Sequence, residues 1–200
     1  MENKSTLENI LKQYLIHFPA ETKRQEGFSE FLSRNVTDQL YTRKNFDGHL
    51  TASAFILNTV LDKILLIHHK SLGKWLQPGG HIDTTDPNIL QAAYREVSEE
   101  TGIPKDQLLL IKTKDDTLPF DIDSHHIPAN PKKNEEGHYH HDFRYLFQYT
   151  GARDITINTE ESLGYKWVDL EQLVDDDIFG SVVEKLKSVT FPSTKNQGTK

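Results

Sequence analysis

Apolar side chains near the start of the chain recur at intervals of three and four residues, which is the spacing of one helix face. The recurrence covers residues 6–18 and predicts an amphipathic helix with Ser5 or Thr6 as its cap and a proline just beyond its end. A second helix is expected over residues 21–34. Residues 1–46 are therefore predicted to form a helical extension that packs on the rest of the chain or on a second subunit.

Runs rich in β-branched and aromatic residues predict strands over the rest of the chain. Two of them, 51–57 and 63–67, are separated by a short polar segment and form a hairpin-like pair. Further strands are expected at 108–112, 119–127, 138–149, 154–158 and 165–168. A terminal helix is expected to begin at Asp169 or Leu170. This mixed order of strands and helices indicates an α/β (α+β) fold, built as a sandwich with a mixed sheet.

Three carboxylates gather on one further predicted helix. Its core-facing stripe consists of Leu90, Ala93 and Val97. On the other side, Glu96 shares a face with Glu99 and Glu100, because residues three and four apart are helix neighbours. Each such pair costs roughly 0.2–0.5 kcal/mol in an isolated helix. A divalent cation offsets this repulsion, and Mg²⁺ prefers oxygen ligands. The helix is therefore interpreted as half of a metal site; the alternative is an acidic face turned to solvent.

A glycine turn before this helix favours the metal site over the solvated face. Pro78, Gly79 and Gly80 precede the acidic residues. Glycine permits close approach of the backbone, as a carbonyl directed at a metal or an amide directed at phosphate requires. A helix face that merely contacts water requires no such turn.

This stretch resembles the signature of the Nudix hydrolases, which is Gly, five residues, Glu, seven residues, then Arg-Glu-apolar-x-Glu-Glu-x-Gly-apolar. The matching residues are Gly80, Arg95, Glu96, Val97, Glu99, Glu100, Gly102 and Ile103. The first half departs from the pattern, because Asp86 takes the glutamate position and eight residues separate it from Arg95. One extra residue in the turn at 84–88 absorbs the difference without moving the helix.

The resemblance implies a Nudix-type α/β/α sandwich in residues 47–190. The polar composition of residues 191–200 predicts a disordered tail. The resemblance also implies a Mg²⁺-dependent hydrolase, with Mn²⁺ as a substitute ion, that cleaves the diphosphate linkage of a nucleoside diphosphate joined to another moiety. The metal ligands would be Glu96, Glu99 and Glu100 with the Gly80 carbonyl. Arg95 would pair with a helix glutamate and orient the ligands.

Members of the family often use a further acidic residue outside the signature, as a ligand or as the base. Glu160 and Glu161 are the candidates by position, with Asp142 behind them. The alternative for both glutamates is a solvated turn. The general base is one of these carboxylates or one of the three on the helix, and the sequence does not choose between them.

Several side chains outside the signature are candidates for substrate binding. Lys70 offers a charge for phosphate, and Trp75 either stacks on a base or covers the core. Alternation along residues 138–149 places four polar side chains on one face, as in a pocket wall; they are His138, His140, Asp142 and Arg144. The first three could converge on a transition metal. Contact with substrate phosphate is preferred, with Arg144 as an anion fork. The polar loop at 115–137 is a further candidate for specificity.

Composition narrows the class of protein. The 200 residues suit one domain with an appendage, and a net charge of −7 argues against nucleic acid as the main partner. The absence of cysteine excludes a disulfide scaffold, a zinc-thiolate site and a cysteine nucleophile. No run is apolar enough to span a membrane, so a cytoplasmic protein with a small-molecule partner is expected, with a homodimer contact as one role for the extension.

Two other functions stay open. A non-catalytic nucleotide sensor would keep the fold and bind its ligand uncleaved. A Nudix-fold isomerase is less favoured, because the isomerases that this chain resembles in fold rely on a cysteine.

Overall fold

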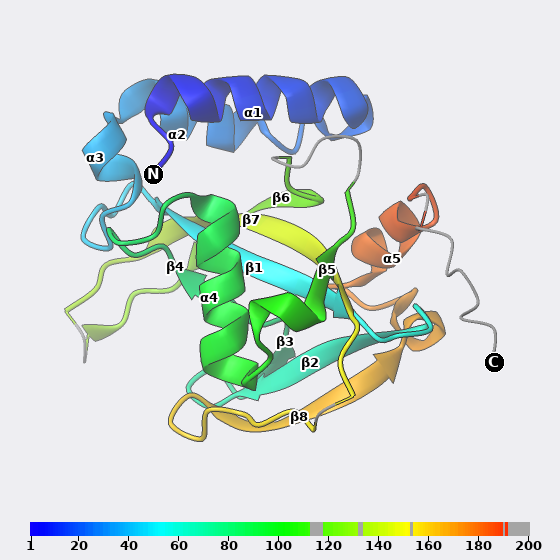
Figure 1. The fold of residues 1–200 in the computed structure, drawn as a ribbon. Helices are drawn as coiled ribbons and strands as arrows, with labels where there is room; N and C mark the ends of the chain where they lie inside the picture. Colours follow the sequence, from blue (N-terminus) through cyan, green and yellow to red (C-terminus); the bar gives the residue numbers. More distant parts are fainter. Residues whose placement is uncertain (113–117, 132–133, 153, 190, 192–200) are drawn as a thin grey trace.

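An eight-stranded mixed sheet forms the centre of the molecule. The computed structural model describes residues 1–112, 118–131, 134–152, 154–189 and 191. The strands are β1 (His49–Leu57), β2 (Lys63–His69), β3 (Lys74–Leu76), β4 (Gly79–His81), β5 (Leu108–Leu110), β6 (Asp121–Ile127), β7 (His138–Tyr149) and β8 (Ser162–Asp169). Their order is β3-β2-β1-β7-β5, with β4 on β1, β6 on β7 and β8 on β2 (Figure 1). β1 and β7 run parallel, and the other pairings are antiparallel.

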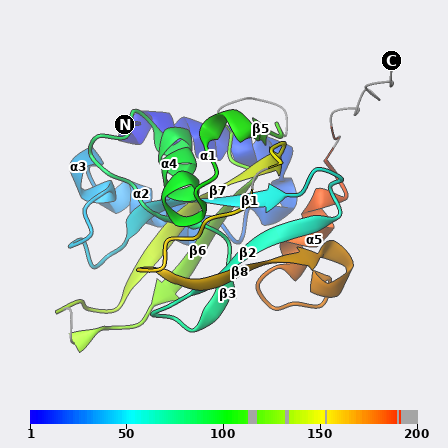
Figure 2. The same cartoon turned by 60° about the horizontal axis from the view of Figure 1, so that its bottom comes forward.

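Helices cover both faces of this sheet. They are α1 (Lys4–His17), α2 (Glu26–Arg34), α3 (Thr37–Leu40), α4 (Ile89–Thr101) and α5 (Gly180–Leu186). Ala52 and Ile56 of β1 share a core with α1, α2 and α4, whereas Phe55 and Leu57 face α5. Figures 1 and 2 show α4 and α5 on opposite sides of β1. The predicted sandwich with a mixed sheet and N-terminal helices is confirmed. Within the described ranges, no helix is both long and apolar enough to cross a membrane.

The N-terminal helices differ from the prediction at their ends. α1 is capped by Asn3, whose side chain accepts the Thr6 N–H at 2.9 Å, so Ser5 and Thr6 are not its cap. The second helix, expected over 21–34, is present but starts later than predicted, because α2 begins only at Glu26. A short 3₁₀ turn, Pro19–Glu21, precedes α2, and the intervening chain directs Gln25 toward β6, where its Nε2 donates to the Ile122 carbonyl at 2.7 Å. This tertiary hydrogen bond accounts for the break.

Two elements expected later in the chain are also wrong. Residues 154–158 form no strand, because their backbone bonds the end of α4: the Thr156 and Asn158 amides donate to the Thr101 and Glu100 carbonyls. The terminal helix does not begin near Asp169. A 3₁₀ turn, Leu170–Leu173, comes first, and α5 starts only at Gly180. Part of the polar loop at 115–137 and most of the expected tail at 191–200 lie outside the described residues.

The glycine turn is part of the sheet. β4 pairs antiparallel with β1, and Gly79 lies opposite Ser53. A Cβ on Gly79 would lie 2.2 Å from the Cβ of Ser53, so no other residue fits there without displacing β1. The turn thereby fixes the position of Gly80, and the start of the signature is held on the central strand.

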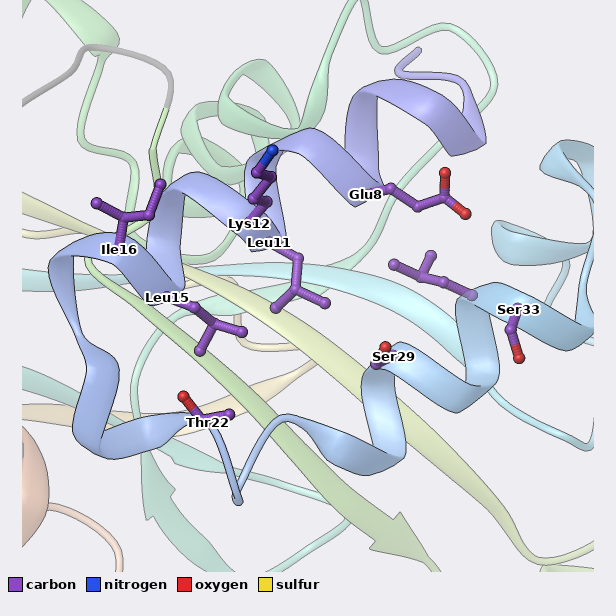
Figure 3. A pocket seen from close by; sticks show the side chains of 9 residues that line it. Glu8, Leu11, Lys12, Leu15, Ile16, Thr22, Ser29 and Ser33 are labelled. Carbon is purple, nitrogen blue, oxygen red and sulfur yellow. The ribbon is translucent and has the colours of Figure 1, made fainter.

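The outer helical layer contains a separate hollow of about 610 Å³ between α1 and α2 (Figure 3). Figure 3 shows its walls, which are Glu8, Leu11, Lys12, Leu15, Ile16, Thr22, Ser29, Leu32 and Ser33. These side chains are mostly apolar or small. The hollow therefore brings together no group of acids or imidazoles, and the candidate chemistry lies elsewhere.

Candidate active site

α4 presents its acidic side to the glycine strand because its other side is buried. Ala93 and Val97 are completely buried in the core shared with β1. The helix begins at Asn88, whose side chain accepts the Gln91 N–H at 2.9 Å. It ends at Gly102, whose φ of 66° is left-handed and favours glycine. The caps fix the length of the helix and the buried stripe fixes its rotation.

Backbone groups of β4 lie against two of the carboxylates. The Gly79 N–H donates to Glu100 Oε2 at 2.7 Å. A Cβ on Gly80 would lie 2.8 Å from Glu96 Oε2, so the strand and this carboxylate are in close contact. Glu100 is buried, whereas the Glu99 side chain is 55% exposed. Glu96 and Glu100 therefore lie against the Gly79–Gly80 backbone, and the more exposed Glu99 lines the same cavity.

Arg95 connects the helix to the turn before it. Its Nη1 donates to Glu96 and Glu99, at 2.9 Å in each case, which is the pairing expected for a positioning residue. Its Nε and Nη2 form a fork on the Asp86 carboxylate, with distances of 3.0 and 2.9 Å. Nη2 also donates to the His81 carbonyl at 2.8 Å. Asp86, where the sequence departs from the signature, therefore holds the arginine in place.

Burial makes two of the helix carboxylates, Glu96 and Glu100, hard to ionise. It raises the pKa of Glu96 to about 7, although Arg95 opposes the shift. It also raises the pKa of Glu100 to about 8. The hydrogen bond from the Gly79 N–H opposes this increase, whereas the charges of Glu96, Glu161 and Glu99 add to it. Crowded, dehydrated carboxylate oxygens with a backbone carbonyl beside them fit a hard divalent cation such as Mg²⁺.

The glutamates face a cavity of about 470 Å³. Its lining residues are Arg43, His69, Lys70, Ser71, Gly79, Gly80, His81, Asp83, Arg95, Glu96, Glu99, Glu100, Glu160 and Glu161. Lys70 is hydrogen-bonded to the turn that carries Glu160 and Glu161. Its backbone N–H donates to the Glu161 carbonyl at 2.8 Å, and its Nζ donates to the Thr159 carbonyl at 3.3 Å. The structure thus brings Lys70, Glu160 and Glu161 together with the signature residues.

A second cavity of about 210 Å³ adjoins the first and shares His69, Gly79, Gly80 and His81 with it. His140 and Asp142 line this cavity. Asp142 accepts hydrogen bonds from Thr51 Oγ1 at 3.0 Å and from Ser53 Oγ at 2.6 Å. It is therefore a buried carboxylate with fixed partners at the edge of an open space.

Three expected substrate contacts, Arg144, Trp75 and His138, line neither cavity. Arg144 is 7% exposed and directs its guanidinium at Asp121, Asp123 and Asp142. Trp75 stacks on His68, with ring centroids 4.8 Å apart, and packs against the core on the α5 side. Three of the five guanidinium N–H groups are bonded to aspartates, so Arg144 is held among carboxylates rather than presented to an anion. The position of Trp75 corresponds to the core-covering alternative.

His138 and His140 belong to a cluster that sequence reasoning did not identify. His49 of β1, His81 of β4 and His125 of β6 are its other members; the ring centroid of His49 lies within 5.0 Å of those of His81, His138 and His140. Burial and the neighbouring rings lower the pKa of His49 to about 4 and that of His140 to about 2. The parallel register that pairs His49 with His140 has no local signal. Arg43, which lines the first cavity, likewise has no local signal in the sequence.

Comparisons with known proteins agree with this arrangement. The family model of the NUDIX domain matches residues 47–186. Over 110 residues, the sequence is 34% identical to a probable DHNTP pyrophosphohydrolase of Lactococcus lactis subsp. cremoris, covering 55% of this chain and 60% of that protein. The chain thus spans less than two thirds of that relative.

Two solved structures show the same fold. A NUDIX-family hydrolase from Clostridium perfringens is 27% identical, with a TM-score of 0.51 over 73% of this chain and 97% of that one. A C. elegans Ap4A hydrolase in a binary complex is 23% identical, with a TM-score of 0.54 over 70% of this chain and 95% of that one. In both comparisons the shared part is nearly the whole of the other chain. The remaining part of the present chain is therefore additional to the common fold.

Proposed function

We propose, because this chain belongs to the NUDIX family, that it is a Mg²⁺-dependent hydrolase that cleaves the diphosphate linkage of a nucleoside diphosphate joined to another moiety. The observation that carries the proposal is one cavity lined by Glu96, Glu99 and Glu100, in which Glu96 and Glu100 contact the Gly79–Gly80 backbone. The related proteins named above, a probable pyrophosphohydrolase and an Ap4A hydrolase, point to phosphoanhydride substrates.

The proposed ligands are the three glutamates and the Gly80 carbonyl, and Mn²⁺ is an alternative ion. A bound Mg²⁺ supplies charge neutralisation at the phosphate oxygens and lowers the pKa of a coordinated water. Arg95 keeps Glu96 and Glu99 oriented through its bonds to both. Lys70 and Arg43 line the same cavity and offer positive charge to the remaining phosphate oxygens. Arg43 belongs to the N-terminal extension, which supports a role of residues 1–46 in shaping the pocket rather than a homodimer.

The proton acceptor is proposed to be Glu160 or Glu161, across the cavity from α4. The charge of Glu161 contributes to the raised pKa values of Glu96 and Glu100, so its carboxylate lies close to theirs. Both residues are exposed on a turn, where they can exchange protons with solvent. His140 and Asp142 remain proposed substrate contacts because they line the adjoining cavity. A cytoplasmic location, expected from the composition, belongs to the same proposal.

A substrate panel tests the proposal. The chain is incubated with nucleoside diphosphate derivatives, dinucleoside polyphosphates and pterin triphosphates, with Mg²⁺ or with a chelator, and the products are identified by mass spectrometry. We expect Mg²⁺-dependent release of a nucleoside monophosphate and a phosphorylated remainder from one class. Ligand that binds but is recovered intact after long incubation would overturn hydrolysis in favour of a nucleotide sensor.

Asp86→Asn should reduce activity without removing any proposed ligand. The asparagine keeps the size of the side chain but loses the charge that holds the Arg95 fork. Residues that position metal ligands typically contribute about 10–100-fold to metal affinity or activity, and we expect a loss in this range in Mg²⁺-titrated turnover. Asp106→Asn is the control, because Asp106 is exposed and lines neither cavity. Equal activity of both variants would contradict the role of Asp86.

The stabilising effect of Mg²⁺ should grow with pH. The pKa values of Glu96 and Glu100 rise from an ordinary 4.5 to about 7 and about 8, so the folded protein holds protons that the unfolded chain has lost. Without metal, stability therefore falls as pH rises through this window. Mg²⁺ binds the ionised form, so the increase in Tm on adding it should be larger at about pH 8.5 than at about pH 6. A pH-independent increase, measured by differential scanning fluorimetry, would contradict this.

A further inference from the structure

Imidazole rings gather at one end of the parallel pair β1 and β7. His49 and His140 are direct partners in the register, and alternation along β7 places His138 on the same face as His140. His138 Nε2 lies 3.3 Å from His140 Nε2. One ligand nitrogen from each of the three residues lies within 4.8 Å of the other two. The three side chains therefore converge on one small volume, from strands at the centre of the sheet.

The spacing matches that of ligands on one transition metal ion. Nitrogen ligands about 2.0–2.1 Å from a tetrahedral zinc lie about 3.3 Å from one another. The pair formed by His138 and His140 already has this separation. His49 approaches His140 with ring centroids 4.6 Å apart and His138 with centroids 4.9 Å apart. One ligand nitrogen of each residue therefore borders a single shared volume.

A backbone contact fixes the tautomer of one ring in the state that binds metal. His138 Nδ1 lies 2.7 Å from the Glu136 carbonyl oxygen, which can only accept, so Nδ1 carries the proton. The lone pair of His138 is therefore on Nε2, which faces the cluster. Histidine ligands commonly donate their second N–H in this way, and the bond fixes both ring orientation and basicity.

The alternative is a set of hydrogen bonds between rings. His140 Nε2 can donate to His138 Nε2, and a similar bond can join His49 and His81, whose Nε2 atoms lie 3.1 Å apart. Such bonds satisfy the rings in pairs. They do not explain why rings from both pairs converge on one volume. A shared cation does explain it, because its ligands must converge.

We propose that His49, His138 and His140 form a binding site for a transition metal ion of the Zn²⁺ class, separate from the carboxylates of α4. Imidazole ligands suit Zn²⁺, Ni²⁺ and Cu²⁺, whereas Mg²⁺ prefers oxygen. Three protein ligands leave one position of a tetrahedral ion open. His140 lines the cavity of about 210 Å³ that adjoins the carboxylate cavity. This cavity is the route of entry, and an anionic group in it can occupy the open position.

Metal titration of the full chain tests the site. Metal-stripped protein is titrated with Zn²⁺ in excess Mg²⁺, which occupies the carboxylates, and affinity is measured by competition with a chromophoric chelator. We expect one Zn²⁺ per chain, with affinity at least about 10–100-fold weaker in His140→Gln and in His138→Gln. Co²⁺ in place of Zn²⁺ should give visible absorption bands of a tetrahedral site, and both variants should lose them.

Matched variants separate this site from the carboxylates and from misfolding. His126→Gln is the control, because His126 is an exposed histidine that contacts Tyr139 on the opposite face of β6 and β7. Glu100→Gln should retain zinc binding whatever its hydrolytic activity, so this result is independent of the proposed function. Zinc binding that survives His140→Gln, or that Glu100→Gln abolishes, would overturn the proposal. Metal-free melting curves show whether each histidine variant is folded.

Discussion

Glu100→Gln is expected to lower Mg²⁺-dependent turnover by at least about 100-fold, since even residues behind metal ligands contribute about 10–100-fold. Glu100 is 3% exposed and accepts the Gly79 N–H at 2.7 Å, so its carboxylate is held beside the proposed metal position. Glutamine keeps the length of the side chain but removes the charge that a hard cation requires. Glu99→Gln should also lose activity. The measurement is kcat/KM as a function of Mg²⁺, with the exposed Glu26→Gln as control.

Stability separates this loss from misfolding. In the metal-free protein Glu100 is a buried carboxylate whose pKa is raised to about 8. Replacing Glu100 with a neutral amide removes the cost of burying a charge near other glutamates. The metal-free variant should therefore melt no lower than the wild type at about pH 8. Adding Mg²⁺ should then raise its Tm less than that of the wild type. Full activity in both glutamine variants would contradict the assignment of the metal ligands.

The part of the site that the sequence predicts is the part encoded locally. Glu96, Glu99 and Glu100 lie on one helix turn, and helix geometry alone places them together. Gly79 and Gly80 come directly before them, and their need for close backbone approach follows from the chemistry of glycine. The alternation along 138–149 likewise predicted which side chains share a face, because the period of a strand is fixed.

The part that the sequence does not predict depends on contacts between distant segments. His49 joins His138 and His140 only through the parallel register of β1 and β7. Arg43 reaches the cavity only because the N-terminal helices pack over the sheet. The sequence predicted Arg144 as an anion fork, but in the structure three aspartates surround its guanidinium. Two of them, Asp121 and Asp123, come from β6. Such partners have no spacing rule in one sequence.

Asp121→Asn is expected to destabilise the fold by about 3–5 kcal/mol, because removing one partner from a buried ionic group leaves the others uncompensated. Asp121 is 3% exposed. Its Oδ1 accepts from Arg24 at 2.6 Å and from Lys185 at 3.0 Å, and its Oδ2 lies 3.4 Å from Arg144. These cations come from the N-terminal segment, α5 and β7. The variant should therefore weaken the attachment of the helical extension as well as the sheet.

Urea unfolding at neutral pH measures the loss, and Asp169→Asn is the control. Asp169 pairs with Lys63 at 2.7 Å, but it is 44% exposed, and exposed pairs contribute about 0–1 kcal/mol. A similar loss in both variants would contradict a special role for the buried group, since it would show that burial adds nothing to the ionic contacts.

The pH dependence of the Asp121→Asn effect has a definite sign. Burial alone would raise the pKa of Asp121, but the charges of Lys185, Arg144 and Arg24 hold it well below its ordinary value of 3.8. A depressed pKa contributes stability that is fully present above 3.8 and is lost as pH falls toward the folded value. The difference in unfolding free energy between wild type and variant should therefore be constant from about pH 8 to about pH 5 and shrink below about pH 4. A difference that grows on acidification would mean that the carboxyl is protonated in the folded protein and that the three cations are balanced by other groups.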